Sequence, residues 1–305
     1  MKFGLIGHPI EHSLSPALFK AGYNGRYTYD LIETPDFEEA YQRFLDGYDG
    51  INVTAPFKEL AIRKADILSE ECQAIGATNL LVKTPEGIKA YNSDYLGVRL
   101  WREKISRLAS LARNDKEEVA RNDKEEVARN DKEEVARNDK GEVARNDKGE
   151  VARNDKGEAG RDDKMPTILI VGMGGAGKAA AEAARSLGSD VILMNRTHYS
   201  EDIRPLSEFR EAFKAADIVI YNLPVRLPEL DQLSQEDFIE GRPKHILEAN
   251  YRNPSFDKDL IQKLKDVHPL TEYTPGETWL LLQALTGYEI FTGESPDLEK
   301  MTACL

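Results

Sequence analysis

The strongest constraint on the fold is a glycine-rich turn that joins an apolar segment to an alanine-rich one. Residues 167–172 read TILIVG, a run of apolar and β-branched residues typical of a buried parallel strand. GMGGAG follows at 172–177, and residues 178–188 have the composition of a helix. The order of strand, G-x-G-x-x-G and helix predicts a Rossmann-type unit, in which the helix N-terminus binds the pyrophosphate of a dinucleotide.

Each glycine of this turn has an expected task. Gly172 makes the tight turn, Gly174 lets the pyrophosphate approach the backbone, and Gly177 allows the helix to pack closely on the strand. Gly175 and Ala176 complete the predicted cofactor-binding loop. The alternative is a purely structural glycine turn, which the flanking strand and helix disfavour.

The end of the next predicted strand indicates which dinucleotide is bound. Rossmann domains that bind NAD usually place a carboxylate about 20 residues after the glycines, where it contacts the ribose 2′-hydroxyl. Here the residues are Asn195, Arg196 and Thr197, none of them acidic. All three can donate hydrogen bonds to a 2′-phosphate, and arginine also stacks on adenine. The sequence therefore predicts NADP as the cofactor, with a solvated loop arginine as the alternative.

A charged repeat stands ahead of this unit. Residues 113–164 read RNDKEEVA three times, RNDKGEVA twice, then RNDKGEAG and RDDK. A period of eight gives no continuous apolar stripe on a helix, which excludes a coiled coil, and the units carry too few apolar residues to stack as a solenoid. We interpret the repeat as a disordered linker, with a solvated single helix as the alternative.

Short apolar runs alternate with helical patterns on both sides of the repeat. Ahead of it, the strand candidates are residues 2–7, 28–33, 50–54 and 78–84, and the helix candidates are 16–23, 36–45, 56–68 and 93–105. This alternation predicts an α/β domain with a largely parallel sheet. After the repeat, further strands are expected at 190–195, 216–222 and 245–250. We expect the tail after Ser255 to be helical.

The predicted architecture is therefore α/β with two domains. Residues 1–105 plus 255–305 are expected to form an N-terminal α/β substrate domain that is completed by C-terminal helices. Residues 165–254 are expected to form the Rossmann-type NADP-binding domain, and the repeat at 113–164 would be an insert between the two.

Composition narrows the class of partner. The net charge of −13 argues against a non-specific binder of nucleic acid or anionic membranes, because both would repel the protein. Cys72 and Cys304 are the only cysteines, which fits a reducing cytoplasm. No apolar run approaches the roughly 18 residues of a membrane span. We expect a cytoplasmic protein that acts on a small molecule, as a monomer or homodimer.

Two residues that follow predicted strands are candidates for catalysis. Lys58 ends the segment NVTAPFK and stands near the start of a helix, where its charge is unfavourable with the helix dipole. Asp94 ends the segment NSD, where a strand passes into a helix. Taken alone, Lys58 reads as a surface lysine and Asp94 as a helix N-cap.

Taken together and in order, the motifs resemble the shikimate dehydrogenase family. The matching stretches are SLSP at 13–16, NVTAPFK at 52–58, GATN at 76–79, NSD at 92–94 and QA at 283–284, besides GMGGAG and NRT. The resemblance covers residues 1 to about 105 and 165 to 305. It implies reversible hydride transfer between NADPH and 3-dehydroshikimate, giving shikimate, in aromatic amino-acid (chorismate) biosynthesis.

The resemblance also implies roles for individual residues. It implies that Lys58 and Asp94 are the catalytic pair. It also implies that the hydroxyls of Ser13 and Ser15 bind the substrate carboxylate. Four further residues are placed at the substrate ring: Thr54, Asn79 and Gln283 at its hydroxyls, and Tyr251 beside it. Three stretches depart from the family pattern. His198-Tyr199-Ser200 follow NRT where the family often has a second basic residue, Glu248 stands where aspartate is usual, and Thr278-Trp279 replaces a Gly-x-Met segment that in the family lies near the nicotinamide.

The chemistry agrees with this pairing. Reducing a ketone places negative charge on oxygen as hydride arrives, and a positioned ammonium such as that of Lys58 stabilises the charge and delivers a proton. Asp94 would orient the lysine and accept a hydrogen bond from a substrate hydroxyl. No metal is needed, and we expect none. The alternatives are a quinate/shikimate dehydrogenase of relaxed specificity and a non-catalytic NADP-binding regulatory module, which has no need of a Lys–Asp pair.

Overall fold

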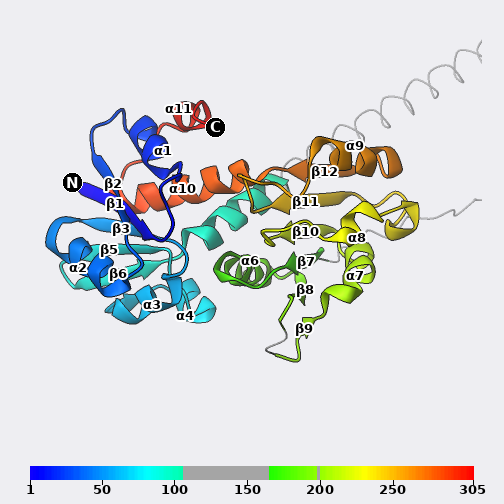
Figure 1. Ribbon diagram of the computed structural model, residues 1–305, viewed down its shortest axis with the longest axis horizontal. Helices are drawn as coiled ribbons and strands as arrows, with labels where there is room; N and C mark the ends of the chain where they lie inside the picture. The colour runs from blue at the N-terminus through cyan, green and yellow to red at the C-terminus, as the bar shows by residue number, and fades with distance from the viewer. Residues whose placement is uncertain (106–164, 198–199) are drawn as a thin grey trace, which may run out of the picture. The chain divides into compact units, whose positions relative to one another are not determined.

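The computed structural model describes residues 1–105, 165–197 and 200–305 (Figure 1). The octapeptide repeat at 113–164 lies outside the described residues, so our interpretation of it stays a prediction. The described strands form two six-stranded sheets, one built from the part before the repeat and one from the part after it. This arrangement confirms the α/β class, and the second sheet has a Rossmann-like strand order.

The first sheet is mixed rather than largely parallel. Its strands are β1 (Lys2–Gly7), β2 (Thr28–Glu33), β3 (Gly50–Val53), β4 (Ile67–Leu68), β5 (Leu80–Thr84) and β6 (Gly87–Tyr91), in the order β2-β1-β3-β5-β6-β4. β1 pairs in parallel with β2 and β3, whereas β5 runs antiparallel to both β3 and β6. The expectation of a largely parallel sheet is wrong at β5, because a tight turn folds β6 directly back onto β5.

The helices of this part follow the predicted pattern with two exceptions, a helix over Glu70–Ile75 that was not predicted and the segment 56–68. The helices are α1 (Ser15–Gly22), α2 (Phe37–Gly47), α3 (Lys58–Ala61) and α4 (Glu70–Ile75), and residues 93–105 are also helical. The predicted helix over 56–68 is wrong, because α3 spans one turn, a 3₁₀ turn follows at Ile62–Lys64, and Ile67–Leu68 pairs with β6. Strand pairing with a distant partner here overrides local helix propensity.

The second sheet is parallel throughout. Its strands are β7 (Thr167–Val171), β8 (Asp190–Met194), β9 (Ile203–Arg204), β10 (Ile218–Tyr221), β11 (Lys244–Glu248) and β12 (Thr271–Thr274), in the order β12-β11-β10-β7-β8-β9. Its helices are α6 (Gly175–Ser186), α7 (Phe209–Ala215), α8 (Pro228–Asp231) and α9 (Lys258–Val267). The strand order reverses at β7, and a ligand site is expected beside the carboxyl end of such a strand.

The C-terminal tail divides between the two sheets. The expectation that it is entirely helical is wrong, because β12 extends the second sheet and Leu260 and Leu264 of α9 belong to that sheet's core. The last two helices, α10 (Gly276–Thr292) and α11 (Leu298–Thr302), instead supply part of the core of the first sheet (Figure 1). We therefore propose a domain division in which residues 255–275 go with the second sheet.

Aromatic packing fixes α10 against the first sheet. Phe291 of α10 stacks on Phe3 of β1 with ring centroids 4.8 Å apart. The hydroxyl of Tyr288 donates to the carbonyl of Ser15 at 3.0 Å. These contacts tie α10 to the start of α1, which carries part of the candidate site. Among the described residues, no helix is both long and apolar enough to cross a membrane.

Candidate active site

A cavity of about 350 Å³ gathers the residues that the sequence singled out. All eight residues predicted for catalysis and substrate binding line it: Ser13, Ser15, Thr54, Lys58, Asn79, Asp94, Tyr251 and Gln283. Ala176 of the glycine-rich turn lines the same cavity. The sequence positions of these residues span most of the chain, so the fold alone brings them together.

Strand direction explains why the residues from the first sheet meet. Thr54 follows the carboxyl end of β3, and Asp94 follows β6, which is parallel to β3 because each is antiparallel to β5. Asn79 precedes β5, so it lies at the same edge, and its carbonyl accepts from the Val53 amide at 2.8 Å. Loops at one edge of a sheet thus deliver all three side chains to one place.

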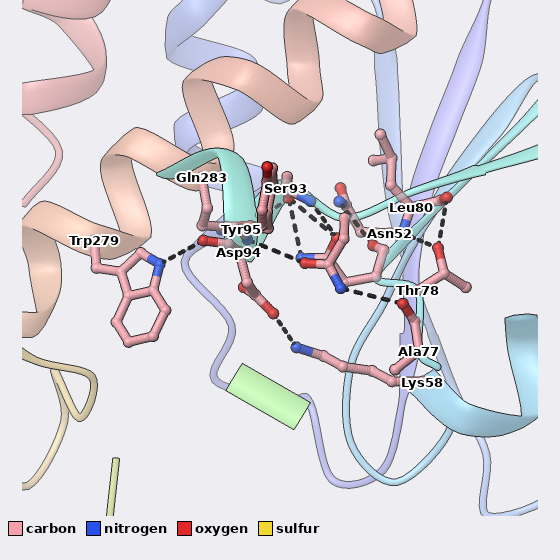
Figure 2. A network of polar contacts seen from close by, with 12 residues as sticks. Asn52, Lys58, Ala77, Thr78, Leu80, Ser93, Asp94, Tyr95, Trp279 and Gln283 are labelled. Carbon is pink, nitrogen blue, oxygen red and sulfur yellow. Dashed lines mark hydrogen bonds and ion pairs between the residues drawn. The ribbon is translucent and has the colours of Figure 1, made fainter. Parts of the chain in front are cut away.

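Lys58 and Asp94 form an ion pair in this cavity (Figure 2). The Lys58 Nζ donates to Asp94 Oδ2, and the two side chains are only 16% and 13% exposed. Lys58 is therefore no ordinary surface lysine. Asp94 is not the helix cap either, because Asn92 precedes the helix and its Oδ1 accepts from the Tyr95 amide at 3.1 Å. A partly buried ion pair costs desolvation energy, so its presence calls for a reason other than stability.

A second polar cluster holds the start of the helix that carries Asp94. The Asn79 side chain donates to Ser93 Oγ at 3.0 Å and accepts from the Ser93 amide at 2.7 Å. Ser93 Oγ in turn donates to Gln283 Oε1 at 3.0 Å (Figure 2). Ser93 is buried and was not among the predicted site residues, although it lies inside the NSD motif.

Two other parts of the cavity wall are preorganised by short contacts. The hydroxyl of Ser13 donates to that of Ser15 at 3.2 Å, and it accepts from the Ser15 amide at the same distance. Asn52 was also missed as a site residue. It lines the cavity, and its Oδ1 accepts from the hydroxyl of Tyr29 at 2.7 Å. Its position two residues before Thr54, in NVTAPFK, is the signal that could have found it.

The glycine-rich turn has the backbone that its predicted tasks require. Gly172 has φ +94°, a conformation that favours glycine. A Cβ on Gly177 would lie 1.9 Å from the Gly172 carbonyl oxygen, whereas a Cβ on Gly174 would meet nothing within 4 Å. Helix α6 begins at Gly175, earlier than the sequence indicated, so the amides of its first turn come from the motif itself. The open space lies beside Gly174, where a pyrophosphate is expected.

The loop after β8 lies apart from this cavity wall. The Asn195 side chain accepts from the Met173 amide at 3.3 Å and donates to the Thr197 carbonyl at 3.1 Å. Asn195 thus links this loop to the glycine-rich turn. Arg196 and Thr197, which follow Asn195 after the end of β8, are exposed.

A buried glutamate holds the loop that brings Tyr251 to the cavity. Glu248, fully buried at the end of β11, accepts from the Ser255 amide and from the hydroxyl of Tyr273 at 2.7 Å. Burial raises the pKa of the Glu248 carboxyl above its ordinary value, and the hydrogen bonds it accepts oppose this effect. The acidic residue that differs from the family pattern therefore has a structural task at this position.

An ion pair joins the first turn of α6 to α3. Lys178 Nζ lies 2.7 Å from Glu59 Oε1, with side chains 33% and 57% exposed. The hydrogen bond from Lys178 is the main cause that lowers the pKa of the Glu59 carboxyl. Glu59 is adjacent to Lys58 in α3, and a Cβ on Gly175 would lie 3.1 Å from Lys58 Cδ. The glycine-rich turn and the Lys58 side chain are therefore in close contact.

Fold and site together define an α/β protein with a substrate domain and a Rossmann-like dinucleotide-binding domain. A profile of the shikimate dehydrogenase substrate binding domain matches residues 5–81. A profile of the NAD binding domain of D-isomer specific 2-hydroxyacid dehydrogenases matches residues 134–265. The first part of the chain is thus similar to the substrate binding domain of the shikimate dehydrogenase family, which the sequence motifs resemble.

Curated relatives of the chain are shikimate dehydrogenases. The chain is 39% identical over 103 residues to the shikimate dehydrogenase (NADP(+)) of Thermotoga maritima, a match that covers 32% of this chain and spans 39% of that protein. It is 24% identical over 322 residues to the corresponding protein of Carboxydothermus hydrogenoformans, covering 98% of this chain and 94% of the relative.

Solved structures share the fold. A shikimate 5-dehydrogenase from Thermus thermophilus, determined with NADP(H) and shikimate, has a TM-score of 0.67 at 22% identity and covers 100% of this chain and 98% of its own. A quinate dehydrogenase from Corynebacterium glutamicum, determined with NAD, has a TM-score of 0.69 at 18% identity, with coverage of 100% and 98%. At these identities the two neighbours establish the fold, and the choice between their substrates depends on the site.

Proposed function

We propose that the protein is a shikimate dehydrogenase, which reversibly reduces 3-dehydroshikimate to shikimate with NADPH in aromatic amino-acid biosynthesis. The observation that carries the proposal is the Lys58–Asp94 ion pair, placed in one cavity with Ser13, Ser15 and the glycine-rich turn. A sensor or regulatory module has no need of such a pair in its ligand cavity, which counts against a non-catalytic NADP-binding protein.

The residues of the pair have distinct tasks in the proposed reaction. NADPH, when bound, supplies the hydride to the ketone carbon. The Lys58 ammonium stabilises the negative charge that develops on the ketone oxygen and gives that oxygen a proton. The carboxylate of Asp94 keeps Nζ in place and accepts a hydrogen bond from the substrate hydroxyl next to the reacting carbon. In the reverse direction the Lys58 amine takes the hydroxyl proton.

The charge of the cavity suits an anionic substrate. Its charged lining residues are Lys58, Asp94 and Arg252, so the described wall carries one net positive charge. Lys58 is already paired with Asp94, which leaves Arg252 as the charge available to a monocarboxylate. Under the proposal the serine hydroxyls bind the carboxylate directly, and Arg252, which is exposed at the rim, attracts it.

The loop after β8 supports NADP as the cofactor. Arg196 and Thr197 are exposed there beside the half-buried Asn195, and the three residues bring no carboxylate to repel a 2′-phosphate. We propose that Gly172, Gly174, Gly175, Ala176 and Gly177 bind the pyrophosphate while this loop binds the 2′-phosphate. The amides at the start of α6 and the helix dipole favour the anionic group.

A steady-state assay tests the proposal. NADPH oxidation is followed with 3-dehydroshikimate, beside NADH, and the reverse reaction is followed with shikimate and with quinate, each with both oxidised cofactors. The proposal expects turnover with shikimate and NADP and a much lower kcat/KM for quinate. Equal efficiency with quinate would establish the relaxed-specificity alternative, and absence of turnover together with tight NADPH binding would favour the non-catalytic one.

A further inference from the structure

Trp279 contacts the backbone of one member of the ion pair. Its indole Nε1 donates to the carbonyl oxygen of Asp94 at 3.1 Å (Figure 2). The side chain is 4% exposed and lines the same cavity as Lys58 and Asp94. The bond joins residues 185 positions apart in the sequence, so it anchors the Asp94 backbone to a distant helix, α10.

The same face of α10 makes a second hydrogen bond to the segment that carries Asp94. Gln283, one helical turn after Trp279, accepts from Ser93 Oγ at 3.0 Å. A Cβ on Gly97 would lie 2.9 Å from the backbone nitrogen of Gln283, so the backbones of the two helices approach closely at this point and leave no room for a side chain on Gly97. Residues four apart lie on one face of a helix, and α10 thus holds Ser93 through Gln283 and Asp94 through Trp279.

A hydrogen bond to the backbone carbonyl of Asp94 restrains the position of the Asp94 backbone, from which its side chain extends. The Asp94 carboxylate positions Lys58 Nζ, and a displacement of about 1 Å at a reacting group is enough to cost a large factor in rate. Carbonyl oxygens have two lone pairs, so the indole adds to the helical hydrogen bonding of Asp94 without competing with it.

We propose that Trp279 is a positioning residue that holds Asp94, and through it Lys58, in the geometry needed for proton transfer. The inference rests on the proposed function, because it concerns the rate of the same reaction. It adds a residue to which no role was assigned, and it predicts that the indole N–H matters more than the volume of the ring.

Two variants and a matched control test this. Trp279→Phe keeps an aromatic ring and Trp279→Met keeps a flexible apolar side chain, and neither has an N–H. Trp101→Phe is the control, because Trp101 is 2% exposed and its indole donates to Thr274 Oγ1 at 3.2 Å, yet it does not line the cavity. Melting temperature, kcat and KM for 3-dehydroshikimate are measured for all three and for the wild type.

Both Trp279 variants are expected to lower kcat by about 3- to 10-fold, the rate equivalent of one lost hydrogen bond, with KM within about twofold of wild type. Trp101→Phe should have its melting temperature lowered by an amount comparable to the Trp279 variants, while its kcat stays at the wild-type value. If either folded Trp279 variant matches Trp101→Phe in kcat, or if KM rises while kcat stays, the inference is wrong. A wild type without dehydrogenase activity would instead overturn the proposed function.

Discussion

Substituting Gly174 by alanine separates cofactor binding from folding. A Cβ at this position would meet nothing within 4 Å, and the backbone at φ −72° and ψ −171° accepts any residue. Two small effects on stability oppose each other. Alanine reduces the entropy of the unfolded chain, worth about 0.4–1 kcal/mol in favour of folding. It is also a poorer N-cap than glycine for α6, which costs about 0.5–1 kcal/mol. The free energy of unfolding is therefore expected to stay within about 0.5 kcal/mol of wild type.

The same methyl group occupies the space in which the pyrophosphate is expected. A displaced phosphate would lose one charge-assisted hydrogen bond to the amides of the turn, worth about 1.5–3 kcal/mol. We therefore expect the Kd for NADPH to rise by about 10- to 100-fold. Fluorescence titration with NADPH measures the affinity, and urea unfolding measures the stability.

Gly177→Ala is the matched counterpart. Its Cβ would lie 1.9 Å from the Gly172 carbonyl oxygen, so the turn must move, and overpacking of this kind costs about 1–3 kcal/mol. If Gly174→Ala binds NADPH as tightly as wild type, the pyrophosphate does not lie against this turn. If it unfolds as readily as Gly177→Ala, the open space beside Gly174 is absent in solution.

Four further predictions concern the ion pair, the two arginines and the buried glutamate. Lys58→Ala should lower kcat for shikimate oxidation by about 10²–10⁴, and Asp94→Asn should add little to that loss in the double variant, because paired catalytic groups act as a unit. Steady-state kinetics check this, and more than half of wild-type turnover in Lys58→Ala would refute it. Arg196→Ala should reduce the preference for NADP over NAD, measured as the ratio of kcat/KM values; an unchanged ratio would exclude Arg196 from the 2′-phosphate site. Arg252→Gln should raise KM for 3-dehydroshikimate by about two- to fivefold at low salt and less at high salt, as an exposed charge does; a salt-independent effect would argue for direct contact. Because the pKa of Glu248 is raised in the folded protein, its contribution to stability is present below about pH 4.3 and is lost as pH rises through its folded pKa. The free energy of unfolding, measured with urea, should therefore differ between wild type and Glu248→Gln by an amount that falls as pH rises. A difference that grows with pH would contradict a raised pKa for Glu248.

The parts of the fold that the sequence predicted are those with long, regular patterns. β1, β2, β7 and β8 carry continuous apolar or alternating runs, and they form as expected. The two-residue strands β4 and β9 were missed because so few residues have no period of their own. β6 was missed because its turn, Pro85-Glu86, lacks the Asn-Gly or Asp-Gly signal of a tight hairpin.

The candidate site was predictable to the extent that its residues stand in motifs that resemble those of the family. Lys58 follows the predicted strand at 50–54, but strand β6 ahead of Asp94 was missed, so the resemblance to the family motifs, and not the strand pattern, placed the two residues together in advance. Contacts between residues that lie far apart in the sequence could not be predicted. The bond between Trp279 and Asp94 and the pair of Glu59 with Lys178 depend on how α10 and α6 pack, which no local pattern encodes.

The most direct test of the account follows the hydride itself. NADPH carrying deuterium at C4 of the nicotinamide is incubated with 3-dehydroshikimate and the protein, and the product is examined by mass spectrometry and NMR. We predict that one of the two C4-labelled forms gives shikimate with a single deuterium on the carbinol carbon, and that no carbon-bound deuterium enters from D₂O. Lys58→Ala should form the same product much more slowly. Shikimate without label, or label taken from the solvent, would contradict direct transfer in this cavity.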